Sequence, residues 1–195
     1  MQPIEILNTV QKLMDFNETD SKRLMQIGPL LTAFGEQLAD MFYSALDTSP
    51  ISKAILDAEP NRRIRLRLTL MEWFEQIFSG KYDAAYAQRR WIIGLVHVRI
   101  GIPPMFVVGS IENVYRFSAH KLVEMTERLN GPLHECLNAL NKMLYIDLAF
   151  IEQCYAQSSL RAMSNEMGAD ANLVQRFASK GASELLDEAR NGKFS

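Results

Sequence analysis

The chain has few cysteines and no long apolar run. Only two of its 195 residues are cysteines, Cys136 and Cys154. If one helix carries both, about 27 Å separates them along its axis. That is too far for a disulfide bond within one chain, so we expect reduced thiols, as in cytosolic proteins. No stretch approaches the roughly 20 apolar residues that span a bilayer, and residues 1–16 lack the basic region and apolar segment of a signal peptide. These absences predict a soluble, cytoplasmic protein.

The sequence also lacks the motifs of several enzyme and nucleic-acid-binding classes. Its formal net charge is −2, which gives no electrostatic reason to expect nucleic acid or an anionic membrane as a partner. It contains no glycine-rich phosphate loop and no plausible nucleophile elbow. Its histidines, cysteines and carboxylates do not stand at the spacing of a zinc site. We therefore expect none of these chemistries.

Apolar residues at helical spacing are what the chain has in quantity. Hydrophobic residues make up 48% of the composition, which is ample for a core, and they recur mostly at three- and four-residue steps, so we predict an all-α fold. A first helix uses residues 4–14, and the capping side chains of residues 17–20 begin a second. We expect Gly28-Pro29 to break this second run into two helices, because proline disfavours helix at the residue before it.

Glycine and proline mark the ends of the other helices. The punctuating segments are, in chain order, Asp47–Pro50, Pro60, Ser79-Gly80, Gly101, Pro103-Pro104 and Asn130–Pro132. Proline suits the first turn of a helix and glycine its end. Two long helices are predicted, one from Pro103-Pro104 to about Leu129 and one from Leu133 to about Tyr155.

The composition changes after Tyr155. Residues 157–159 and 164–170 are polar, and only a weak amphipathic segment follows them. We therefore predict one domain over residues 1–157 and a C-terminal extension over residues 158–195, either helical or a linker.

Each of the two long helices is apolar on more than one face. A helix of this kind usually buries one face in its own core and the other against a partner. Two such antiparallel helices per subunit could form a four-helix bundle with a second copy. We expect a homodimer, with packing inside one subunit as the alternative.

Of the three histidines, His97 has the most apolar surroundings. It lies within the sequence Trp91-Ile92-Ile93-Gly94-Leu95-Val96-His97-Val98. A histidine on an apolar helix face is usually a hydrogen-bonded core residue, but a neutral imidazole in an apolar pocket is also a strong axial ligand for haem iron. We interpret His120 and His134, which stand beside charged residues, as ordinary structural histidines rather than ligands.

Three motifs together resemble the globin-coupled sensor and protoglobin family. Residues 94–104, Gly-Leu-Val-His-Val-Arg-Ile-Gly-Ile-Pro-Pro, are similar to its proximal-histidine signature. Residues 78–83 and Tyr86 are similar to the segment that precedes it, and residues 42–46, Phe-Tyr-Ser-Ala-Leu, to the distal tyrosine motif. The resemblance covers roughly residues 15–155. It implies an all-α globin fold, a helical sandwich around haem, with an extra N-terminal helix and long C-terminal helices suited to a dimeric bundle.

The resemblance also implies roles for individual residues. His97 corresponds to the proximal iron ligand, and Tyr43 to the distal tyrosine that donates a hydrogen bond to bound oxygen, with Phe42 beside it. Leu66 corresponds to the apolar distal gate, and Thr69, one turn later, to a position where some relatives carry a second hydroxyl. The alternatives are a half-buried tyrosine at 43, plain core packing at 66, and a threonine bonded to its own helix at 69.

The chain departs from the family after the two prolines. Many relatives have a Trp-Tyr pair there, whereas this chain has Phe106 and Val107, so a proximal hydrogen-bond relay through that hydroxyl is in doubt. Three arginines of the His97 helix could approach haem propionates, although we favour a solvated helix face for each. They are Arg89, Arg90 and Arg99.

The implied cofactor is one haem b (iron protoporphyrin IX), bound non-covalently because the chain has no Cys-x-x-Cys-His. The implied function is the binding of O2, or of CO or NO, as a sensing signal rather than enzymatic turnover. In such sensors a downstream signalling domain or protein receives the signal, and we expect this chain to be either self-contained or cut from a longer sensor. Two alternatives remain open: a haem-free globin that acts as an interaction module, and a haem enzyme such as a nitric-oxide dioxygenase or weak peroxidase.

Overall fold

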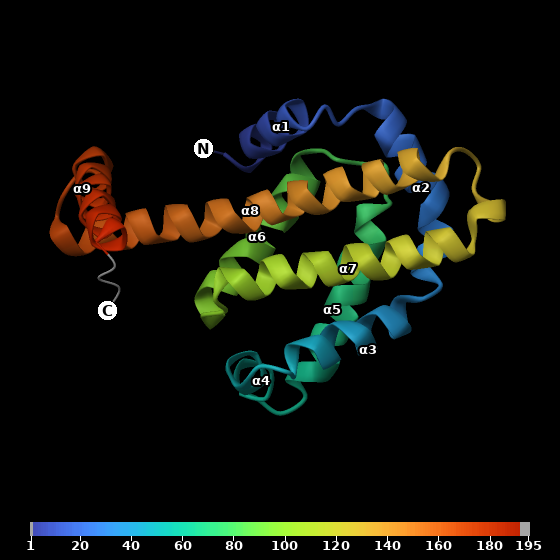
Figure 1. Ribbon diagram of the computed structural model, residues 1–195, viewed down its shortest axis with the longest axis horizontal. Helices are drawn as coiled ribbons and strands as arrows, with labels where there is room; N and C mark the ends of the chain where they lie inside the picture. The colour runs from blue at the N-terminus through green and yellow to red at the C-terminus, as the bar shows by residue number, and fades with distance from the viewer. Residues whose placement is uncertain (1, 192–195) are drawn as a thin grey trace.

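A computed structural model describes residues 2–191, which form nine α-helices and one 3-10 turn (Figure 1). The elements are α1 (Pro3–Leu13), α2 (Glu18–Thr32), α3 (Gly35–Leu46), α4 (Pro50–Leu56), α5 (Arg62–Ile77), α6 (Ala84–Ile100), α7 (Pro104–Glu124), the 3-10 turn (Thr126–Arg128), α8 (Leu133–Met167) and α9 (Ala171–Arg190). The all-α prediction is confirmed. Within the described residues, no helix has the length and apolar character needed to cross a membrane.

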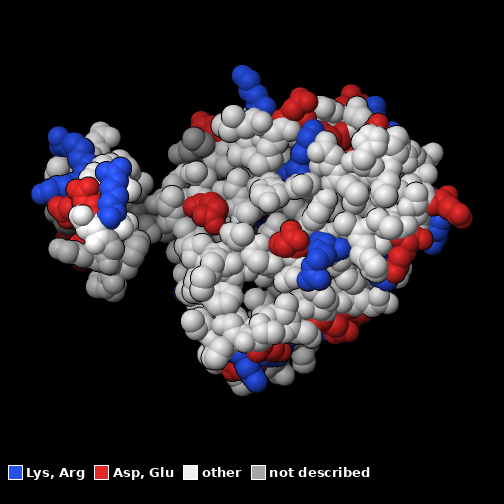
Figure 2. All heavy atoms as spheres, viewed as in Figure 1, with Lys and Arg blue, Asp and Glu red and all other residues white. Residues whose placement is uncertain are grey.

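The helix α8 is the centre of the fold. It packs against α6, α7, α2 and α1, while α3 packs on α7 and on α5. In Figure 1, α7 and α8 run side by side, α3 and α4 lie beyond α7, and α5 crosses α7. The helix α8 continues past the other helices and carries α9 across its end. On the face that Figure 2 shows, charged side chains of both signs are scattered among uncharged ones.

Local sequence signals explain most of the helix ends. The Asn17 side chain accepts a hydrogen bond from the Thr19 amide, and the Asp20 carboxylate accepts one from the Asn17 amide, which together cap α2. Asp83 caps α6 by accepting from the Tyr86 amide at 3.0 Å. The same helix ends at Gly101, whose φ of +73° lies in the left-handed region that glycine adopts without strain.

The predicted break at Gly28-Pro29 is wrong, because α2 continues to Thr32 and α3 begins at Gly35. Pro29 lies in the last turn of α2, and its missing N–H costs the helix one backbone hydrogen bond to the residue four positions earlier. The preceding glycine is packed tightly: a Cβ on Gly28 would lie 2.6 Å from the Cβ of Phe78. Contact between α2 and the end of α5, which the local sequence does not reveal, holds this turn in place.

The predicted end of the second long helix, near Tyr155, is also wrong. The helix α8 runs on to Met167 and stops at Gly168, which has a φ of +59°. No glycine or proline interrupts it, and the polar residues after Tyr155 mark where the helix leaves the core rather than where it ends. The boundary that we predict at 157/158 falls inside this helix and stays a prediction. Residues 192–195 of the predicted extension lie outside the described part.

Candidate functional site

His97 lies in the last turn of α6, and its side chain is half-buried. Its Nδ1 is 2.8 Å from the carbonyl oxygen of Ile93, one turn earlier. Because a carbonyl can only accept, Nδ1 carries the proton and the lone pair of Nε2 is free. Burial lowers the pKa of the imidazole below its ordinary value, so the ring is neutral at physiological pH. The hydrogen bond to the Ile93 carbonyl thus leaves the lone pair of Nε2 available to a metal ion.

Tyr43 lies on α3 in a small apolar cluster, and only 9% of it is exposed. Burial raises the pKa of its phenol well above the ordinary value, so the hydroxyl is a protonated donor. Among the described residues, 2–191, no protein group accepts a hydrogen bond from it. The apolar side chains of the cluster are Ala39, Leu56 and Leu70, with Phe42, Leu46, Leu66 and Trp73 packed against them. A tyrosine hydroxyl that donates to no protein group remains available to donate to a small ligand.

The structure brings three of the predicted distal residues together and separates the fourth. Phe42 meets the ring of Tyr43 edge to face, with 5.2 Å between centroids, and Leu66 packs against the same cluster. Thr69 is exposed, and its hydroxyl donates to the carbonyl of Arg65 at 3.0 Å. Thr69 therefore makes the hydrogen bond to its own helix that we gave as the alternative to a role in the site.

A buried charged network lies between these helices, and our interpretation of Arg90 as a solvated residue is wrong. Arg90 on α6 and Asp147 on α8 are 1% and 3% exposed, with 2.8 Å between Arg90 Nε and Asp147 Oδ2. The Asp147 carboxylate also accepts from Trp73 Nε1 at 2.8 Å and from the Tyr86 hydroxyl at 2.7 Å. Burial raises the pKa of this carboxyl, while Arg90 and the two neutral donors oppose that shift. Arg89 and Arg99 are exposed, as expected.

The network joins the helices that carry the proximal and distal residues. Arg90 precedes His97 by two helical turns on α6, and Trp73 follows Leu66 by two turns on α5. Asp147 connects both to α8. The sequence did give a signal for Asp147, which is a carboxylate between Ile146 and Leu148 in an apolar stretch. A buried charge of this kind needs a partner.

Further contacts hold α6 against α8 near His97. Gly94 lies so close to α8 that a Cβ on it would be 2.5 Å from the Sγ of Cys154, which donates to the carbonyl of Trp91. The Tyr155 hydroxyl donates to the carbonyl of Ile102, just past the end of α6. Val107 is buried and supplies no hydroxyl on this side. The tyrosine hydroxyl on this side therefore belongs to Tyr155 of α8, a residue that the sequence did not single out.

The imidazole of His97 suits an iron that a porphyrin already holds. Within residues 2–191, no three His, Cys, Asp or Glu side chains cluster closely enough to bind a metal ion. A porphyrin needs only one axial donor from the protein, and a neutral imidazole with its Nδ1 proton already bonded supplies one. His97 is such a group.

Comparison with known proteins identifies a matching family and a similar fold. The sequence model of the Protoglobin family matches residues 5–161. The chain belongs to the protoglobin family. Its fold is similar to that of the globin domain of the Geobacter sulfurreducens globin-coupled sensor, with a TM-score of 0.68 and 26% sequence identity over 76% of this chain and 96% of that one. This protoglobin thus has a globin-like, all-α fold, and the matched residues include His97 and Tyr43 and leave out α9.

Proposed function

We propose that this protoglobin binds one haem b non-covalently through Nε2 of His97 and binds O2 reversibly as a sensing signal, with CO and NO as further ligands. The observation that carries the proposal is the hydrogen bond from His97 Nδ1 to the Ile93 carbonyl. This bond fixes the tautomer and orients the ring, which are the two things required of an axial ligand. Family membership makes haem the expected cofactor.

The chain's own residues supply the surroundings of the gas. The haem would supply a ferrous iron with one coordination position open to a diatomic molecule. Leu66 and Phe42 exclude water on the distal side, which strengthens any hydrogen bond made there. Thr69 remains a proposed neighbour, and its hydroxyl would have to leave the Arg65 carbonyl in order to act.

Tyr43→Phe is expected to speed the release of O2. Bound O2 gains negative character, and a hydrogen bond to a charged acceptor is worth about 1.5–3 kcal/mol, so the rate should rise about tenfold to hundredfold. Stopped-flow displacement of O2 by CO measures this rate. Tyr145→Phe is the matched control, because Tyr145 is exposed on α8 and should leave the rate unchanged. An equal rate in Tyr43→Phe and the native protein would remove Tyr43 from this role.

The signal is proposed to leave through α7 and α8 of a homodimer. Exposed apolar side chains on α7 support a four-helix bundle with a second copy: Val108 and Val123. The contacts that hold α6 on α8 would pass a change at His97 to that interface. A cytoplasmic signalling domain or protein would receive it. Hydrogen exchange at the dimer interface that is identical with and without gas would contradict this output.

Two rival functions are separable by simple measurements. A haem-free interaction module would show no intense visible absorbance after reconstitution with haem. A nitric-oxide dioxygenase or peroxidase would consume NO or peroxide steadily in the presence of a physiological reductant.

A further inference from the structure

The helix α9 carries an apolar strip that the other helices of the described chain leave largely uncovered. Its Val174 is buried against the end of α8, but Phe177 and Leu185, which lie on the same side of α9, are 51% and 65% exposed. Leu186, on the opposite side, is 51% exposed and does not belong to this strip. In Figure 1, α9 stands across the end of α8, apart from the other helices. It lies outside the residues matched by the family model, 5–161. The strip is therefore a feature of this chain's extension rather than of the globin core.

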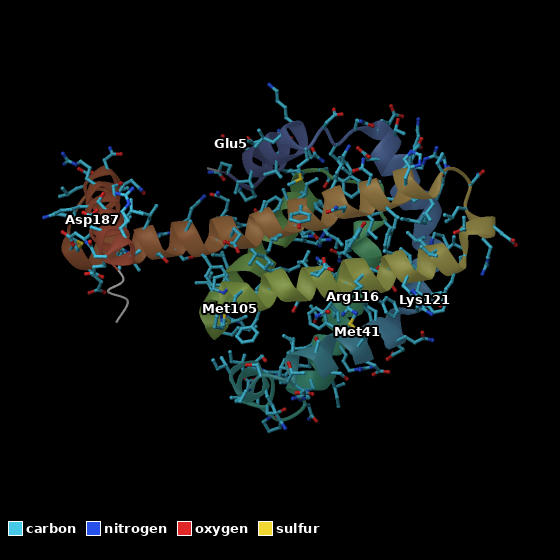
Figure 3. The ribbon with its side chains drawn as sticks, in the orientation of Figure 1. Glu5, Met41, Met105, Arg116, Lys121 and Asp187 are labelled. Atoms are coloured by element: carbon cyan, nitrogen blue, oxygen red, sulfur yellow. The ribbon has the colours of Figure 1, made fainter. Side chains whose placement is uncertain are left out.

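The charges of α9 are divided between its two halves. Residues 171–181 contain Arg176 and Lys180 and no acidic residue, whereas residues 182–190 contain Glu184, Asp187, Glu188 and only one base, Arg190. Both signs are visible close together on α9 in Figure 2, and Figure 3 labels Asp187 there. Within the helix these charges make only long, exposed contacts, such as 3.9 Å between Lys180 and Glu184, so they remain available to a partner.

We propose that α9 pairs antiparallel with α9 of a second copy of this chain. In that arrangement each apolar strip covers the other, and the basic half of each helix faces the acidic half of its partner. The two helix dipoles also oppose each other favourably. A parallel pair would instead place like charges together. An anionic membrane would attract the first half of the helix and repel the second, so a second copy fits better than a lipid surface.

Gly181 gives independent support for this arrangement. It lies at the middle of the 20-residue helix and one helical turn from both Phe177 and Leu185, so it belongs to the same strip. No other part of residues 2–191 lies within 4 Å of the position that its Cβ would take, so packing among them does not require a glycine there. Glycine weakens a helix interior relative to alanine. Near the two-fold axis of an antiparallel pair, it lets two backbones approach closely.

A cysteine cross-link tests the pairing and its direction. In the haem-loaded chain of residues 1–195, Gly181→Cys should form a disulfide between copies under mild oxidation, because both thiols lie beside the axis. Glu188→Cys stands on the same strip, but its two copies would lie about 20 Å apart in an antiparallel pair, beyond disulfide reach. It should not cross-link. The native cysteines are buried and unpaired, so they do not compete.

Charge reversal makes the test specific. Two variants are made in the Gly181→Cys background. The first carries Arg176→Glu and Lys180→Glu, so both halves of α9 are acidic. The second carries Glu184→Lys and Glu188→Lys, so both halves are basic. Each protein alone should lose the cross-link, and an equal mixture should regain it as a mixed dimer, which also shows that each variant helix still folds. The cross-link should form equally in His97→Ala, because it is independent of haem.

Four results would overturn the proposal. The first is no cross-link at position 181 in the native background, and the second is equal cross-linking at 181 and 188, which indicates a parallel pair. The third is no recovery in the mixture. The fourth is loss of the cross-link when vesicles of phosphatidylserine bind the chain, which would assign the strip to a membrane surface. None of these results bears on the haem assignment.

Discussion

His97→Ala is expected to abolish stable haem binding. The change removes the imidazole whose Nδ1 is bonded to Ile93, and the other two histidines, His120 and His134, are exposed on α7 and α8, so neither can replace it. After reconstitution, the ratio of the haem absorbance to the protein absorbance should fall to the level of weakly associated haem.

Two further variants separate ligation from a general loss of stability. His120→Ala removes an exposed imidazole that lies 3.2 Å from Glu124, and it should keep the full haem content. His97→Gly supplemented with free imidazole should recover haem, because the added imidazole can occupy the space of the missing side chain. Full haem content and an unchanged ferrous spectrum in His97→Ala would show that the proximal assignment is wrong.

Asp147→Asn is expected to lower the free energy of unfolding by about 3–5 kcal/mol, because it leaves the Arg90 guanidinium buried without a counter-charge. Both side chains are almost fully buried, so water cannot replace the lost interaction. Urea denaturation monitored by circular dichroism measures the loss. Arg90→Met combined with Asp147→Asn should recover a large part of it, since removing both charges relieves the unpaired one.

An exposed ion pair provides the comparison for the Asp147 result. Arg65 contacts Glu59 at 2.9 Å, but both side chains are more than half exposed. Arg65→Ala should therefore change the free energy of unfolding by no more than about 1 kcal/mol. If Asp147→Asn is no more damaging than Arg65→Ala, the network does not stabilise the junction of α5, α6 and α8.

The parts of the fold that follow from local chemistry are predictable from the sequence. Asn17 and Asp83 have side chains that cap helices, and Gly101 ends α6 in a left-handed conformation. The site motifs are local too. One motif surrounds Tyr43 and another surrounds His97, and within each motif the residues stand a few positions apart along the chain. Their resemblance to the family could therefore be read before any packing was known.

The parts that depend on distant contacts were not predictable. Pro29 stays in a helix because Gly28 packs on Phe78, 50 residues away. Arg90 looks like a surface arginine in the sequence, and only its contact with Asp147, 57 residues later, makes it a buried one. The length of α8 was underestimated because a change to polar composition looks the same whether a helix ends or merely leaves the core.

The absorption spectrum of the reduced, haem-reconstituted protein, recorded before and after O2 is admitted, tests the central claim most directly. The account predicts a ferrous spectrum typical of one axial imidazole, a distinct spectrum when O2 is added, and return of the first when O2 is removed. It also predicts a separate spectral change with CO. Failure to retain haem, or a reduced spectrum that neither O2 nor CO alters, would contradict the account.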